Sequence, residues 1–358
     1  MQNNQAIPFN KENFKAIFSK EFALVIIISV PSAIVAEFFN MPLAWFLGPM
    51  LITSLASLMG FKTKMPKLIL SSILILLGLY IGNYIDKSLF SQMHQWAFTS
   101  LIMLIYIVVS VLIVSKYLQI FSKYGRKTSI FSAAPGALGP LMILAEDEKS
   151  DLSQVATSHL IRLIIIITVF PFIVNSFYDV ENAKIAEDII KDQNIFHLIL
   201  LIVSSIILII VFDKFRVPAA LLSGTLFASG FLQISEIASY QFPPNIIDYC
   251  LLILGASVGC RFADKTFGEI ASNALHSFVA TFLLVVLGLL AAFAASLIID
   301  KNFFTLLLSY CPGGIYEVAV IAIFFDLDPE FVSFHHIIRL LMILFIVPSM
   351  LKIIEKKT

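Results

Sequence analysis

The sequence has very little charge. Only 13% of its residues are Asp, Glu, Lys or Arg, and the formal net charge is zero. Hydrophobic residues make up 59% of the chain, and the mean hydropathy is +0.94. A soluble globule of 358 residues needs more polar surface than this. The composition therefore indicates an integral membrane protein, with the lipid bilayer as its first partner.

Patterns typical of several other classes of protein are also lacking. No basic tract resembles a nucleic-acid footprint, so we expect no nucleic-acid partner. The three cysteines, Cys250, Cys260 and Cys311, lie in or beside apolar segments and form neither a disulfide framework nor a pair with metal-ligand spacing. No His-x-x-x-His pair occurs in the sequence. We therefore expect no metal and no cofactor.

The N-terminus has no pattern of a cleaved signal peptide. Residues 1–21 are polar and include Lys11, Lys15 and Lys20, and no cleavage site follows the next apolar run. Basic residues favour the cytoplasmic side of a membrane. We expect residues 1–21 to form a cytoplasmic tail of a multi-pass inner (plasma) membrane protein, with residues 352–358 as a second cytoplasmic tail.

Apolar runs long enough to cross a bilayer recur throughout the chain. A polar, acidic stretch, residues 178–194, separates two series of them and predicts a linker between repeat 1 (22–177) and repeat 2 (195–351). The fold class predicted is an all-α polytopic membrane protein with about ten spanning helices. These lie near 22–39, 43–60, 68–85, 96–115, 152–175, 195–212, 218–233, 246–263, 274–299 and 330–351.

Two Pro-Gly motifs reveal an internal duplication. Pro135-Gly136-Ala137 returns 177 residues later as Pro312-Gly313-Gly314. Each copy is followed by an Asp, a His, an Arg and a Pro at the same spacing. Such a match in polar and conformationally special residues indicates two tandem repeats. The residues are Asp151, His159, Arg162 and Pro171 in the first copy, and Asp328, His336, Arg339 and Pro348 in the second.

Glycine pairs repeat at the same offset. Gly78 and Gly82 correspond to Gly255 and Gly259. Two glycines four residues apart let another helix approach closely. Packing is the simpler interpretation, and a place beside a substrate path is the alternative.

The Pro-Gly motifs predict discontinuous helices in segments 128–146 and 303–325. Pro lacks an N–H and Gly allows unusual dihedral angles, so both helices should break. A break at membrane depth persists only where protein or water surrounds it, and the following helix directs free N–H groups into that space. One break per repeat is typical of a transporter site. A packing kink without a ligand is the alternative. The predicted binding residues here are Pro135, Gly136, Ala137, Gly139, Pro312, Gly313, Gly314, Tyr316 and Glu317.

Ionisable residues accompany both breaks. Arg162 and Arg339 lie about 11 residues inside their helices, near mid-bilayer at 1.5 Å per residue, and each follows a His by three positions. Charges at that depth are costly and mark functional sites. We predict that both arginines contribute to substrate binding and that His159, His336 or Glu317 couples transport to protons. The alternative is structural: Arg339 pairs with Glu317 or with a backbone carbonyl to hold the break in shape.

The charges in the loops favour inverted repeats. If each Pro-Gly segment is re-entrant, each repeat has five crossings and the repeats are inverted. If each segment crosses, the repeats are parallel. The inverted scheme places more Lys and Arg on the cytoplasmic side. Both schemes leave the two termini in the cytoplasm.

The duplicated motif resembles the AbrB-type duplicated membrane proteins, whose members carry the labels of an ammonia monooxygenase or a regulator of gene expression. The resemblance covers Phe22 to about Leu351 and is carried by Cys311 to Val318 and the His-x-x-Arg helix that follows. The first repeat departs from the pattern, because Ala137 replaces a Gly and Pro140 stands where an acidic residue is expected. The architecture is also distantly similar to the cation-proton antiporter and anion symporter superfamily.

These observations predict a secondary transporter or permease for a small polar or anionic solute. A membrane-embedded sensor that alters gene expression indirectly is the alternative. A membrane monooxygenase would need clustered His or carboxylate ligands, which the sequence lacks, so we expect no enzyme. The sequence leaves open whether H⁺ or Na⁺ is the coupling ion and whether the chain forms a homodimer.

Overall fold

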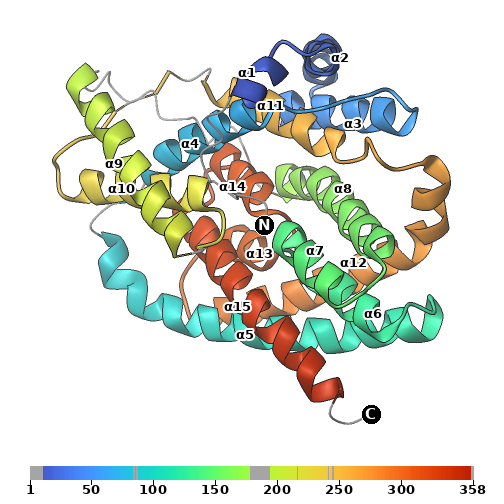
Figure 1. Ribbon diagram of the computed structural model, residues 1–358. Helices are drawn as coiled ribbons and strands as arrows, with labels where there is room; N and C mark the ends of the chain where they lie inside the picture. The colour runs from blue at the N-terminus through green and yellow to red at the C-terminus, as the bar shows by residue number, and fades with distance from the viewer. Residues whose placement is uncertain are drawn as a thin grey trace. The chain divides into compact units, whose positions relative to one another are not determined.

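The computed structural model describes residues 11–83, 85, 88–177, 194–215, 217–240, 242–243 and 246–355. The predicted linker at 178–194 lies outside these residues except for Asn194, as do residues 1–10 and 356–358 of the two predicted tails. Every regular element in the described part of the chain is an α-helix (Figure 1). The helices are α1 (Lys11–Ala16), α2 (Lys20–Phe38), α3 (Ala44–Leu58), α4 (Lys67–Gly82), α5 (Ser88–Phe121), α6 (Arg126–Ala133), α7 (Leu138–Asp147), α8 (Leu152–Phe177), α9 (Ile195–Lys214), α10 (Ala220–Ile234), α11 (Ile246–Cys260), α12 (Phe267–Ser296), α13 (Phe303–Tyr310), α14 (Ile315–Phe324) and α15 (Pro329–Glu355).

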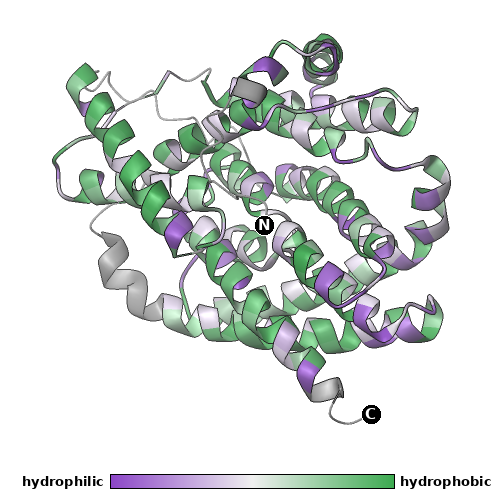
Figure 2. Ribbon diagram, in the orientation of Figure 1, coloured by the Kyte–Doolittle hydropathy of each residue, from purple (hydrophilic) through white to green (hydrophobic). Residues whose placement is uncertain are grey.

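The helices have the length and hydropathy of membrane-spanning segments. In the part of the chain that the structure describes, α2, α5, α8, α9, α12 and α15 are long and apolar enough to cross a bilayer. Five further apolar helices, α3, α4, α10, α11 and α14, are shorter. Figure 2 shows hydrophobic residues along most of each long helix, with hydrophilic residues gathered mainly near helix ends. The prediction of an all-α polytopic membrane protein is confirmed.

The described helices form two compact units, and each unit draws on both sequence repeats. The first unit takes its residues from Met1–Leu89, Pro171–Thr266 and Ile323–Glu330. The second takes them from Phe90–Phe170, Phe267–Ala322 and Phe331–Thr358. The duplication therefore does not produce two separate globules, because each compact unit needs segments from both repeats.

Glycines bring the repeats together in the first unit. A Cβ at Gly78 of α4 would lie 2.7 Å from the carbonyl oxygen of Leu222 in α10. A Cβ at Gly259 of α11 would lie 2.7 Å from the backbone nitrogen of Ser54 in α3. These contacts allow backbones of different repeats to touch, as small residues do in membrane helix pairs. The predicted packing role of the glycine pairs is thus visible in the helix contacts.

In the second unit, the helix boundaries repeat with the sequence offset. Helices α6 and α13 have equivalent first and last residues at a shift of 177, and so do α7 and α14. The long helices that follow, α8 and α15, also begin at equivalent residues. Each repeat therefore contributes two short helices and a long one, and the site described below is built from these six helices.

Candidate functional site

Each Pro-Gly motif separates two short helices (Figure 1). Helix α6 ends at Ala133 and α7 begins at Leu138, and Gly136 between them has φ 117°. A glycine is required there because L side chains rarely adopt this conformation. Ala137 follows in the left-handed conformation with φ 62°. The predicted breaks in the helices are therefore present in both repeats.

The two breaks begin alike and then diverge. Ala134 and its equivalent Cys311 have nearly identical backbone angles, φ −61° and ψ 129° against φ −60° and ψ 130°. Positive φ values follow in the first repeat, at Gly136 and Ala137. The second repeat has neither of these positive φ values at Gly313 and Gly314. The two repeats therefore share the backbone conformation at the first residue of each break but differ at the residues that lead into the next helix.

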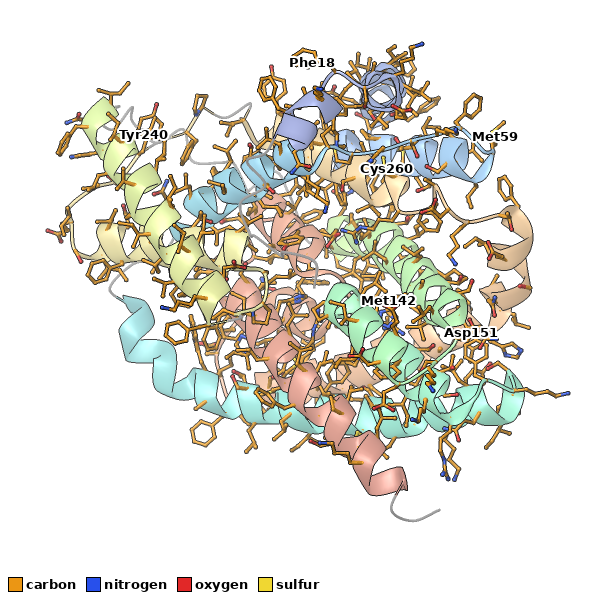
Figure 3. The ribbon with its side chains drawn as sticks, viewed as in Figure 1. Phe18, Met59, Met142, Asp151, Tyr240 and Cys260 are labelled. Carbon is orange, nitrogen blue, oxygen red and sulfur yellow. The ribbon has the colours of Figure 1, made fainter. Side chains whose placement is uncertain are left out.

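The first broken segment folds back on itself. Lys127 at the start of α6 forms an ion pair with Glu148 just after α7, with Nζ 2.5 Å from Oε2. Thr128 Oγ1 accepts a hydrogen bond from the backbone nitrogen of Asp151 at 3.1 Å. Figure 3 labels Asp151 where α7 connects to α8. Because both ends of the segment meet, α6 and α7 form a hairpin.

A contact in the second repeat has a similar placement. The Lys301 ammonium, two residues before α13, lies 5.6 Å from the centre of the Phe331 ring near the start of α15. The start of α13 and the start of α15 therefore lie at the same end of the second unit. An α13–α14 hairpin satisfies this contact, whereas two helices running on in one direction would separate these two ends.

The buried arginines hold the ends of the first short helices. Arg162 donates from Nη1 to the Ala134 carbonyl at 2.6 Å and from Nη2 to the Ser132 carbonyl. Arg339 donates from Nη1 to the equivalent Cys311 carbonyl and from Nη2 to Gly313 at 2.6 Å. The last carbonyls of a helix have no partner within the helix and carry its negative end. Each guanidinium therefore caps the C-terminal end of α6 or α13.

The histidines are part of the same network. His159 Nε2 lies 2.9 Å from the Phe131 carbonyl, and His336 Nε2 lies 2.9 Å from the equivalent Leu308 carbonyl. A carbonyl can only accept, so each Nε2 carries the proton. His336 Nδ1 then accepts from Arg339 Nη2 at 3.2 Å. His336 is therefore a neutral ring with both nitrogens engaged.

The two breaks lie close together within the second unit. A Cβ at Gly136 would lie 2.9 Å from Arg339 Nη2 and 3.2 Å from its Cζ. A Cβ at Gly313 would lie 3.5 Å from Ile166 on α8. Each break thus contacts the long helix of the other repeat. Arg339 extends this relation, because it caps its own repeat and touches the break of the other.

The second short helices begin differently in the two repeats. Glu317, the third residue of α14, is buried, and its carboxylate lies against Gly314 at the N-terminal end of that helix. The equivalent residue in α7 is Pro140, which is exposed. Gly139 is exposed as well, and no atom lies within 4 Å of where its Cβ would be. The first break is therefore open where the second is filled.

The other predicted site residues differ in exposure. Pro135, Ala137 and Pro312 are buried, while Gly314 and Tyr316 are partly buried. All of the predicted residues lie in the second unit, at or beside the breaks. In the described residues, no group of three or more His, Cys, Asp or Glu side chains is placed to hold a metal ion.

A neighbouring polar cluster was not predicted from the sequence. His335 Nε2 lies 2.7 Å from Thr99 Oγ1 on α5, and Tyr310 donates to the Thr99 carbonyl at 2.8 Å. The Trp96 and Phe331 rings pack against this cluster. A comparison of the two repeats could have pointed to this cluster. His335 is an ionisable residue at a position where the first repeat has Ser158.

These features define a polytopic helical membrane protein with two broken, converging segments. The AbrB family model, described as transition state regulatory protein AbrB, matches residues 2–82 and 45–355. The chain belongs to the AbrB family.

Two curated relatives are distant but extensive matches. "Putative regulator AbrB" of Escherichia coli (strain K12) is 23% identical over 323 residues, which cover 88% of this chain and 91% of the relative. "Uncharacterized protein YhjN" of Bacillus subtilis (strain 168) is 22% identical over 297 residues, covering 78% of this chain and 77% of the relative. No solved structure gives a significant match.

Proposed function

We propose that this protein is a secondary transporter or permease for a small polar or anionic solute, which binds at the two breaks. One observation carries the proposal: two hairpin segments, one from each repeat, bring their breaks together beside two fully buried arginines. Discontinuous helices in paired repeats are the usual construction of transporter sites. Buried ionisable groups at such a point are costly unless function requires them.

The charge at the breaks favours an anion. Arg162 and Arg339 are 2% and 0% exposed, and their described hydrogen-bond partners are carbonyls and one His, not carboxylates. Glu317 supplies one nearby negative charge against these two positive charges. Capping of carbonyls is the structural role given above as the alternative for Arg339. The positive charge of each guanidinium nevertheless remains. The excess positive charge supports a solute with at least one anionic group.

The hydrogen bonds favour Glu317 over the histidines for proton coupling. Adding a proton to His336 would place an N–H against the Nη2 donor of Arg339. His159 already donates to a carbonyl and has Arg162 three residues away on the same helix. Glu317 is a buried carboxylate at the second break, where a proton or Na⁺ neutralises its charge. We propose H⁺ or Na⁺ as the coupling ion at Glu317.

Reconstitution tests the proposal directly. The purified full chain is placed in liposomes with radiolabelled organic acids, amines and ammonium, under imposed H⁺ or Na⁺ gradients. We expect gradient-dependent accumulation of one or more carboxylate-bearing solutes, with none in protein-free liposomes. Glu317→Gln should remove the dependence on the gradient. No movement of any solute under any gradient, with stoichiometric copper or iron in the purified protein, would contradict the proposal and favour an oxygenase.

A second candidate function is indirect regulation of gene expression. The family description and the name of the Escherichia coli relative favour it. In our proposal, regulation follows from what the membrane protein binds or moves. Transcript levels in cells that carry a transport-inactive variant distinguish the two. Unchanged regulation without transport would make the sensor the primary function.

A further inference from the structure

We propose that the anion-binding position lies only in the first break, at the N-terminal end of α7, and that α14 does not bind an anion because Glu317 already occupies its N-terminal end. The inference rests on the proposed function and assigns different tasks to the two repeats. Arg339, from the second repeat, supplies the positive charge beside the first break.

Within the described residues, the first backbone N–H groups of α7 donate no backbone hydrogen bond. The first N–H groups of a helix have no partner within the helix, and they carry its positive end. Ala137 is the N-cap and makes no side-chain capping bond. Its carbonyl accepts from Leu141 at 2.9 Å, which starts the helical ladder. The N–H groups of Leu138 and Gly139 therefore have no partner within the helix, and Gly139 is exposed with no atom within 4 Å of a Cβ position.

Arg339 is a second and independent pointer to an anion here. Its side chain is fully buried and packs against Gly136, with Nε 3.3 Å from the position of a Cβ. Nε, like that of Arg162, has no hydrogen-bond partner within the described residues, but it is the Arg339 guanidinium that lies against Gly136. A buried guanidinium N–H without an acceptor is costly. An anion at the first break would accept from this region as well as from the α7 backbone.

The second repeat has the opposite character at the equivalent residues. Glu317 takes the third position of α14, where an acidic side chain reaches back toward the helix start. Its carboxylate lies against Gly314 and leaves no room for a Cβ there. In α7 this position is Pro140, which has neither a charge nor an N–H. A second anion would meet repulsion at α14 but not at α7.

The test compares two equivalent cysteines, Gly139→Cys and Tyr316→Cys, which are 177 residues apart. Each is introduced in the full chain after Cys250, Cys260 and Cys311 are replaced by Ala, the residue found at the position equivalent to Cys311. The purified proteins react in nanodiscs with the anionic reagent MTSES and the cationic reagent MTSET, and free cysteine gives the reference ratio. Thermal unfolding confirms that each variant is folded.

We expect the MTSES to MTSET rate ratio at Gly139→Cys to exceed the reference by about tenfold or more, since a nearby positive charge favours the anionic reagent. At Tyr316→Cys the ratio should fall below the reference. Adding Pro140→Glu to Gly139→Cys places a carboxylate at the equivalent of Glu317 and should lower the ratio by about tenfold.

Equal ratios at the two cysteines, or no reaction at Gly139→Cys, would overturn the inference. The transporter proposal is judged separately by uptake through the unmodified protein. Uptake without the charge preference refutes this inference alone, whereas the preference without uptake refutes the transporter and leaves the anion site.

Discussion

At the scale of single residues, Arg162 and Arg339 perform the same capping task but have different neighbours. Arg162 bonds two carbonyls at the end of α6, and Arg339 bonds the Cys311 carbonyl at the end of α13 and the Gly313 carbonyl within the break. Arg339 also packs against Gly136 at the break of the other repeat, whereas the nearest neighbours of a Cβ at Gly313 come from Val318, Ile166 and Cys311. Stability should therefore depend on both arginines, and solute handling more strongly on Arg339.

Lysine substitutions separate these roles. Arg339→Lys and Arg162→Lys keep the charge but lose the two-pronged donor geometry, so each should cost about 2–5 kcal/mol as carbonyls lose their partners. Unfolding of the two proteins in detergent should be shifted by similar amounts. Uptake measured below the unfolding temperature should fall further in Arg339→Lys. A loss of the same size in Arg162→Lys would show that capping alone explains the effect.

A pair of glycines tests the geometry of the first break. Gly136→Ala forces a side chain into φ 117° and toward Arg339, which should cost about 1–3 kcal/mol. Gly139→Ala is the matched control, because no atom lies within 4 Å of the new methyl group. Thermal unfolding should separate the two variants clearly. Equal stability would contradict the backbone conformation described for the break.

At the scale of helices, the hairpin fold of the broken segments favours inverted repeats. The ion pair between Lys127 and Glu148 joins the two ends of the first segment. If the ten longer helices each cross once, each repeat has five crossings. An odd number of crossings inverts the second repeat relative to the first. This agrees with the distribution of Lys and Arg in the sequence.

Cysteines at equivalent corners test this topology in cells. Asp147→Cys, at the end of α7, and Asp326→Cys, just after α14, should label from opposite sides of the membrane. A membrane-impermeant maleimide applied to intact and to permeabilised spheroplasts distinguishes them. The Asp147 position should react only after permeabilisation and the Asp326 position before it. Labelling of both from one side would indicate parallel repeats.

Much of the helical pattern could be predicted, because apolar runs and Pro-Gly motifs are local features of the sequence. The 177-residue offset is visible when the two halves of the sequence are compared. The path through each break could not be predicted, since it depends on contacts such as Thr128 with Asp151. The partners of Arg162 and Arg339 were also undetermined. Carbonyls leave no signature in a sequence, whereas Glu317 was visible as a candidate partner.

At the scale of the whole molecule, the two compact units are built across the repeats. Contacts of α3 with α11 and of α4 with α10 join the repeats in the first unit. The second unit contains both broken segments. The sequence reveals the duplication but not this exchange of segments, because the exchange is a property of tertiary packing.

Split chains test the exchange. Residues 1–185 and 186–358 expressed separately should each be degraded, because each half lacks the helices that bury its glycine faces. Co-expression should yield a complex that purifies through a tag on either half and unfolds in one transition. Stable, monodisperse protein from one half alone would show that a repeat folds without the other.

The contacts between α6 and α8 run in step: Thr128 meets Asp151, Phe131 meets His159, and Ala134 meets Arg162. These three rungs make the two helices a single stiff brace. Within the described residues, no side chain caps the N-terminal end of α7. We therefore expect α6 and α8 to keep their positions when a solute binds or leaves. In the same step we expect α7 to rotate about Gly136.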